Sequence, residues 1–324
     1  MRIFLFALLT LVPSSALSQA APATSKPDTV KLGFAWPANV RARVDARRYR
    51  QRKTQSKHDT VDVSMSYRMT ASRTGEEYLI VLDDFRLSGS DAVPQRTLVA
   101  EQLGGFVPSY RVRASGEFAR LESLKAMRAF LDSLMTSWTT KDGPLPPHVK
   151  QLITTLTSDA VLEARAAEEW NALVGMWIGA QLEVGEVYGL EGEEPIPVFQ
   201  NAVVKYQYEF SALRRLPCDS VATPTARDCV ELQMVSMPDS AAMRQLFERL
   251  VGNILADSAG TFRFTEFNLE NVVTLVARPE MLLPVHLTVV KTLSGSARAE
   301  GHTDTIHQVE VKTHNYTYEK KNEE

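Results

Sequence analysis

Apolar and polar residues alternate with period 2 in the first third of the chain. From Val61 to Ala71 the odd-numbered positions are apolar or aromatic and the even-numbered positions are polar. Because successive strand side chains point to opposite faces, this pattern predicts a strand with one buried face and one wet face. Gly75 marks a turn, and the more apolar residues 78–87 are expected to complete a hairpin.

The segment just upstream, residues 41–57, alternates too, but its phase changes. Alanine and valine fill the even positions from 42 to 46, whereas arginine fills the even positions from Arg48 to Arg52. A one-residue slip moves every side chain to the other face unless a bulge absorbs it, so we expect a bulge near Arg47–Arg48. With the following hairpin, this strand would form an antiparallel meander.

The C-terminal part of the chain repeats this style. Alternation runs from Val204 to Ala212 and returns in later segments, the last of which is residues 306–318. A change of phase between Phe264 and Phe267 indicates another bulge. Strands longer than the usual five or six residues predict a strongly curved sheet.

Between residues 119 and 174 the apolar positions instead recur every three or four residues. This period predicts three amphipathic helices, the first of which ends at the GPLPP segment, residues 143–147. Ser158 or Asp159 is expected to cap the third helix. A further helix is expected to begin near Pro238, a residue suited to a first helical turn.

The order of elements predicts an α+β fold, in which long curved antiparallel sheets built from meander hairpins pack against helices. We expect a sheet lobe at residues 31–118, a central helical segment at 119–175, and a second sheet lobe with one helix at 176–318. A charged tail at 319–324 ends the chain. The strand–strand–helix–strand order occurs in both lobes. The two lobes do not share residue identities that would distinguish a duplication from a coincidence.

The first twenty residues contain the three parts of a secretory signal peptide. Arg2 precedes the apolar run Ile3–Val12, and small residues precede a cut after Ala20. The run is much shorter than the ~20 residues that span a bilayer, and no later run is longer, so we expect no transmembrane segment. We predict cleavage near Ala20, a flexible leader at residues 21–30, and a secreted or periplasmic protein. A short N-terminal core helix is the alternative.

Export changes the interpretation of the two cysteines, Cys218 and Cys229. In an oxidising compartment an even pair of cysteines favours a disulfide. The two flank a polar segment between strand-like segments, so the bridge would join the ends of a hairpin loop. The alternatives are a metal pair and a redox dithiol, but the spacing matches neither a zinc knuckle nor Cys-x-x-Cys.

Composition and motifs exclude several classes of function. The 324 residues are 44% hydrophobic and 23% charged, as in packed soluble proteins, and the net charge of −3 gives no reason to expect nucleic acid. The sequence contains no phosphate-binding loop, dinucleotide fingerprint, zinc-protease motif or nucleophile elbow. The histidines lack metal-ligand spacing, and the adjacent acidic pairs do not form a glycosidase dyad. We therefore assign no catalytic residue, metal or cofactor.

The strongest charge feature is the basic segment, residues 41–57, in which Asp45 is the only acidic residue. One interpretation is a solvated strand that resists aggregation. The other is a site for anionic head groups, a polysaccharide or an acidic partner, because the arginine fork suits phosphate and carboxylate. The candidate ligand-binding residues are Arg41, Arg43, Arg48, Arg50 and Arg52.

These observations favour a non-enzymatic protein of the cell envelope that binds an apolar or amphiphilic ligand, such as a lipid, between sheet and helices. At the level of fold only, such a cup is similar to half-barrel carriers and sensors of bacterial envelopes. The first alternative is a protein–protein interaction or scaffolding module with a self-filled core, and the second is an enzyme of unrecognised type. A cavity above ~300 Å³ lined by strand aromatics would favour ligand binding over the scaffold.

Overall fold

The computed structural model describes residues 28–55, 57–89, 109–129, 131, 153–218, 229–254, 263–299 and 302–319. The predicted signal peptide, its cleavage site and the GPLPP segment lie outside the described residues. So do most of the predicted leader and the charged tail after Glu319.

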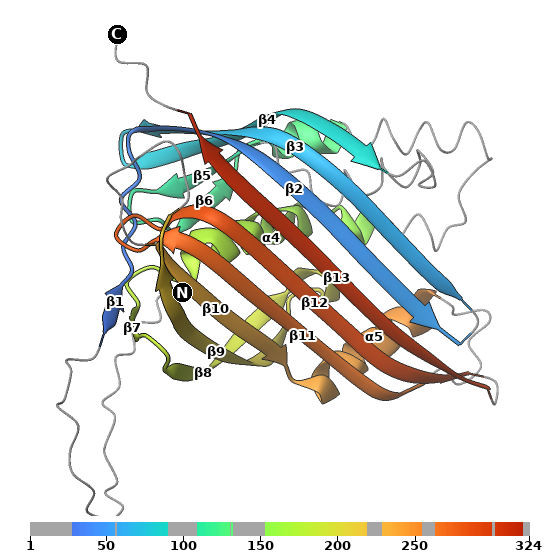
Figure 1. The fold of residues 1–324 in the computed structure, drawn as a ribbon. Helices are drawn as coiled ribbons and strands as arrows, with labels where there is room; N and C mark the ends of the chain where they lie inside the picture. The colour runs from blue at the N-terminus through green and yellow to red at the C-terminus, as the bar shows by residue number, and fades with distance from the viewer. Residues whose placement is uncertain are drawn as a thin grey trace, which may run out of the picture.

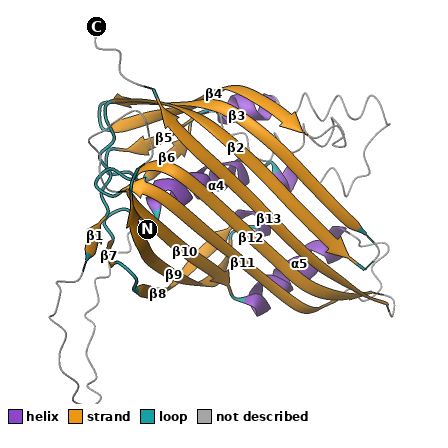
Figure 2. Cartoon of the chain, viewed as in Figure 1, coloured by secondary structure: helices purple, strands orange, loops and turns teal. Residues whose placement is uncertain are grey.

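One antiparallel sheet of 11 strands dominates the fold (Figure 1). It curves around α4 and α5, which lie on its concave side (Figure 2). In spatial order the strands are β6 (Phe118–Leu121), β5 (Ser109–Arg113), β4 (Glu77–Gly89), β3 (His58–Thr74), β2 (Asn39–Thr54), β13 (His302–Tyr318), β12 (Leu283–Ala299), β11 (Arg263–Arg278), β10 (Cys229–Pro238), β9 (Ala202–Leu216) and β8 (Val187–Ile196).

The first and last long strands of the sheet, β2 and β13, pair with each other. Their register runs from Ala42 opposite Tyr318 to Thr54 opposite Ile306. The strands expected in two separate lobes therefore belong to one sheet, while the predicted lobe boundaries stay a prediction. The long curved antiparallel sheet is confirmed, but the fold is mostly β rather than a balanced α+β.

The helices differ in detail from those expected. The third predicted helix is α4 (Asp159–Trp170), which continues into the π-helical turn η1 (Asn171–Gly175); Ser158 precedes it without a side-chain cap. The helix predicted near Pro238 is α5 (Ser240–Ile254), and Pro238 is instead the last residue of β10. Asp239 caps α5, because its Oδ1 accepts a hydrogen bond of 2.7 Å from the backbone N–H of Ala242.

Two predicted boundaries are wrong, namely the start of the helical segment and the end of the leader. Leu121, which the period placed in the first helix, ends strand β6, and residues 124–129 are helical. The leader was expected to reach Val30, but Thr29–Lys31 is strand β1, which pairs with β7 (Gln181–Glu183). Val30 is buried there, because its side chain joins the main core.

The predicted bulge at Arg47–Arg48 is also wrong. β2 pairs with β3 and with β13 without any shift of register. The alternation changes phase because the concave face itself changes from apolar to charged along β2, so the arginines continue on the same face as Ala46. The bulge predicted between Phe264 and Phe267 is confirmed by the register shift between Phe264 and Glu266.

The main core fills one end of the concave side with aromatic rings. Trp170 of α4 lies 5.4 Å from the Trp36 ring and 5.8 Å from the Tyr110 ring, measured between centroids. The indole of Trp170 donates a 2.7 Å hydrogen bond to the carbonyl of Gly116, so this buried N–H is satisfied. A smaller apolar cluster packs α5 on the sheet through Val204, Met243, Leu246 and Phe267.

The predicted disulfide is present, and it joins Cys218 to Cys229. Cys229 begins β10 opposite Leu216, the last residue of β9, so the bridge ties two neighbouring strands at their ends. Such bridges are typical of secreted and periplasmic proteins.

Candidate functional site

The register of the sheet arranges the concave side chains in rows across the strands. Next to the aromatic core, one row is mainly apolar and contains Leu232, Leu275, Leu287, His314, Ala46 and Met65. The following row contains Met234, Val273, Val289, Lys312, Arg48 and Val63. The next contains Ser236, Asn271, Lys291, Glu310, Arg50 and Val61.

The last two rows place a group of charges on the concave face, here named the charged belt: Arg48, Arg50, Lys291, Glu310 and Lys312. Arg48 Nη2 lies 3.0 Å from Glu310 Oε2, and Lys312 Nζ lies 3.8 Å from Glu310 Oε1. The Glu310 side chain is 12% exposed and that of Arg48 23%. Burial alone would raise the pKa of Glu310, but the hydrogen bond and charge of Arg48 outweigh it and lower this pKa.

Helix α4 brings acidic side chains opposite the belt. Glu168 forms an ion pair with Lys291, which joins the helix to β12. Glu169, beside it, is half-buried, and this burial raises its pKa although Lys312 opposes the shift. The belt itself contains four cations and one carboxylate, so it keeps positive character beside these two helix residues.

A pocket lies where the belt meets the strands β3 and β4. Its polar lining comes from Arg47, Arg48, Lys312, His314 and Glu169. Its apolar lining comes from Ala46, Val63, Met65, Tyr67, Leu82, Phe85 and Leu87. The free space is about 60 Å³. This volume is much smaller than the ~300 Å³ that a whole drug-sized ligand needs. It holds about two water-sized groups.

The apolar wall of the pocket is held in place by ring contacts. Tyr67 and Phe85 stack with centroids 5.3 Å apart. The Tyr67 hydroxyl lies 3.4 Å from His314 Nδ1. Burial lowers the pKa of His314 to about 4, so the imidazole is neutral at pH 7 and adds no charge to the pocket.

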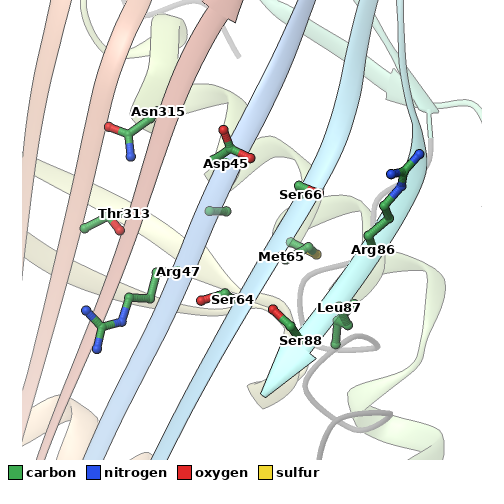
Figure 3. Close-up of a pocket in the computed structure, with 11 residues that line it drawn as sticks. Asp45, Arg47, Ser64, Met65, Ser66, Arg86, Leu87, Ser88, Thr313 and Asn315 are labelled. Carbon is green, nitrogen blue, oxygen red and sulfur yellow. The ribbon is translucent and has the colours of Figure 1, made fainter. Parts of the chain in front are cut away.

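The opposite, convex face carries a different hollow of about 400 Å³, which spans β13, β2, β3 and β4 (Figure 3). Most of its lining residues are polar, with Asp45, Arg47, Ser64 and Thr313 among the side chains drawn. Arg47 is engaged there by a bidentate contact with Asp62 of β3. This hollow has no aromatic lining, so it does not meet the condition set for an apolar ligand.

The structure separates the five arginines chosen from the sequence. Arg41 and Arg43 lie on the convex face, where Arg43 contacts Asp45, whereas Arg48, Arg50 and Arg52 lie on the concave face. Of the five, Arg48 lines the pocket. Their role as ligand-binding residues stays a prediction.

Sequence reasoning missed the partners that complete the pocket, namely Lys312, His314 and Glu169. A signal was present in residues 306–318, since Lys312 and His314 have the same parity as the aromatic Tyr316. That parity puts them on the apolar face of the strand. Nothing in the sequence indicates that β13 lies beside β2.

Comparisons with known proteins give no family. No known family and no curated protein matches the chain. Among solved structures, the chain is similar to a structure titled for lipid–protein interactions in lipovitellin, with 9% sequence identity and a TM-score of 0.37. The match covers 88% of this chain and 25% of the lipovitellin chain, so this chain spans about a quarter of the length of lipovitellin. A similarity this low carries no argument about function.

None of the helices in the described part of the chain is long and apolar enough to span a bilayer.

Proposed function

We propose that this protein acts after export and binds an amphiphile with an anionic head group on the concave face of its sheet. The observation that carries this proposal is the pocket in which Arg48 and Lys312 lie beside a wall of seven apolar side chains. A pocket that places cations beside apolar side chains serves either to bind a ligand or to hold a structural ion pair. The experiments below separate these two roles.

The two ends of the pocket suit the two ends of an amphiphile. A carboxylate or phosphate head group would bind Arg48 and Lys312, where Glu310 already shows that these cations hold a carboxylate. The carbons next to the head group would contact Tyr67 and Phe85, and each buried methylene contributes about 0.8 kcal/mol. The charge thus orients the ligand and the wall supplies affinity.

The size of the space sets a limit on how the ligand lies. About 60 Å³ holds only the first few atoms of a chain. A longer tail would continue along the concave face, where Val61 and Leu293 are only half-buried. The aromatic end of the concavity is closed to it, because Trp170 and Trp177 are fully buried there. That filled end is the observation that favours the alternative role of a scaffold.

Titration of the purified full chain with dodecanoate and with dodecanol tests the proposal. The two probes share a tail and differ in charge, so we expect dodecanoate to bind at least tenfold more tightly. Lys312→Met should remove most of this difference, because it removes a cation from the pocket and keeps the apolar stem. Lys53→Met, on the convex face of β2, is the matched control. Equal affinity for both probes, or an unchanged difference in Lys312→Met, would refute the proposal.

Export is tested separately by the intact mass of the secreted protein. We expect a chain that begins at Ala21, with the Cys218–Cys229 disulfide formed. Recovery of Met1 on the secreted chain would contradict cleavage. Native mass spectrometry of the same sample should show a bound amphiphile.

A further inference from the structure

Strand β8 ends the sheet, and its far edge has no neighbouring strand among the residues that the structure describes. Its near edge pairs with β9 along its whole length, from Val187 opposite Ser211 to Ile196 opposite Ala202. A strand of 10 residues is about 33 Å long at 3.3 Å per residue. Edge strands of this length expose backbone groups that can pair with another chain.

Pro195 shows which backbone groups point outward. Proline has no N–H, so within a sheet it occupies positions whose nitrogen faces away from the neighbouring strand. Backbone direction alternates along a strand, so residues of the same parity, Gly189, Glu191 and Glu193, direct their N–H and C=O groups to the open edge. The edge therefore carries a regular set of donors and acceptors.

Apolar side chains are also exposed at this end of the sheet. Val187 and Leu190 of β8 are 64% and 60% exposed, and Val203 and Leu213 of β9 are 61% and 39% exposed. Elsewhere in the described residues, only Leu156 is a large hydrophobic residue of comparable exposure. Leu190 lies on the concave face of β8 and Val187 on its convex face, so both faces of the edge strand offer exposed apolar surface to a partner.

The charge of β8 selects the kind of partner. Glu191, Glu193 and Glu194 lie on the strand, and Glu194 accepts a hydrogen bond from Tyr208. If two copies of β8 paired with each other, carboxylates of both copies would lie close together, and like charges facing across strands are destabilising. The charge therefore disfavours a second copy and favours a basic partner.

We propose that β8 is a docking edge for an extended, basic segment of another protein, which adds to the sheet as a further strand. Glu191 and Glu193 share the convex face of β8 and Leu190 lies on the concave face, since register places it opposite Tyr208. The segment that fits alternates lysine or arginine on one face with apolar residues on the other. This site is separate from the concave pocket and does not depend on it.

The test is titration of the full chain with a synthetic peptide of about ten residues that alternates lysine and valine, with a glutamate-for-lysine peptide as the comparison. We expect the basic peptide alone to bind, with weaker affinity at high salt. On binding, the backbone N–H groups of Gly189, Glu191 and Glu193 should become protected from hydrogen exchange.

Two variants make the result specific to β8. Gly189→Pro removes one outward N–H without removing a bond to β9, and it should weaken the basic peptide at least tenfold. Glu191→Lys should do the same through charge, and it keeps the proposal testable if the proline variant does not fold. Glu280→Lys, at the β11–β12 turn, makes the same charge change elsewhere and should have no effect.

Equal binding of the two peptides, or unchanged binding in Gly189→Pro and Glu191→Lys, would overturn the proposal. So would a dimer of the chain alone that Gly189→Pro dissociates, because the occupant would then be a second copy. Absence of any peptide binding would assign the carboxylates and Pro195 to protection of the edge against aggregation.

Discussion

Replacement of Arg48 by methionine tests whether the charged belt is a buried network or an ordinary wet surface. The substitution keeps an unbranched apolar stem and removes the charge that lies 3.0 Å from Glu310. Removal of one partner from a buried ion pair costs about 3–5 kcal/mol, because the other charge stays buried and uncompensated. Lys312 remains 3.8 Å from Glu310, so we expect the lower end, about 3 kcal/mol.

The assay is urea unfolding at pH 7.5, followed by tryptophan fluorescence. Arg48→Met/Glu310→Met should cost much less than Arg48→Met, because no buried charge is then left alone. Arg52→Met is the matched control on the same face of β2, where the side chain is exposed, and it should change stability by less than about 0.5 kcal/mol.

The pH dependence gives an independent check. In the native chain the pKa of Glu310 is lowered, so its contribution is present above the unfolded value of 4.5 and is lost as pH falls. Without Arg48, burial raises this pKa instead, and protonation relieves the penalty in acid. The cost of Arg48→Met should therefore shrink from pH 7.5 to pH 4.5. A cost below about 1 kcal/mol at both pH values would refute the reasoning, because exposed pairs have that strength.

Three further predictions concern single residues. Cys229→Ala should lower stability by about 3 kcal/mol, the chain-entropy value for a loop of roughly a dozen residues, in urea unfolding without reductant; a variant as stable as the oxidised native chain would contradict it. His314→Gln should reduce the loss of stability between pH 6.5 and 4. The native His314 pKa of about 4 lies below the ordinary 6.5, so the unfolded state takes up the proton first and the folded state loses stability as pH falls through this range. An unchanged pH profile would contradict this prediction. Gly116→Ala should lower the melting temperature by several degrees, because φ is +91° there and a Cβ would lie 2.7 Å from the Phe34 ring; an unchanged melting temperature would contradict it.

The elements of this fold were predictable where burial is one-sided. The alternation of residues 61–71 and 204–212 corresponds to β3 and β9, because one face of each strand packs against the core and the other meets water. The disulfide was predictable for a different reason, since the export predicted from the first twenty residues favours a disulfide for an even pair of cysteines. The helix period was predictive for α4 and α5, although Pro238 ends a strand instead of beginning a helix.

The prediction failed where one face of a strand changes character along its length. In β2 the concave positions change from Ala46 to Arg48, and the sequence pattern resembles a register slip. A register slip and a change of face character differ in which residue the arginine contacts, and here Arg48 contacts Glu310 on β13. That residue is far away in sequence, so no local pattern could identify it.

The sequence by itself determined that the chain contains long, curved, antiparallel strands, amphipathic helices and a disulfide. These features depend on neighbours within a few residues or on the chemistry of a residue type. Only the tertiary structure decided that the first and last long strands pair into one sheet, that Arg48 and Lys312 share a pocket with Tyr67, and that β8 is left at an edge. Each of these depends on contacts between distant segments, because strand order follows from which apolar faces bury one another, and many orders are compatible with the same local pattern.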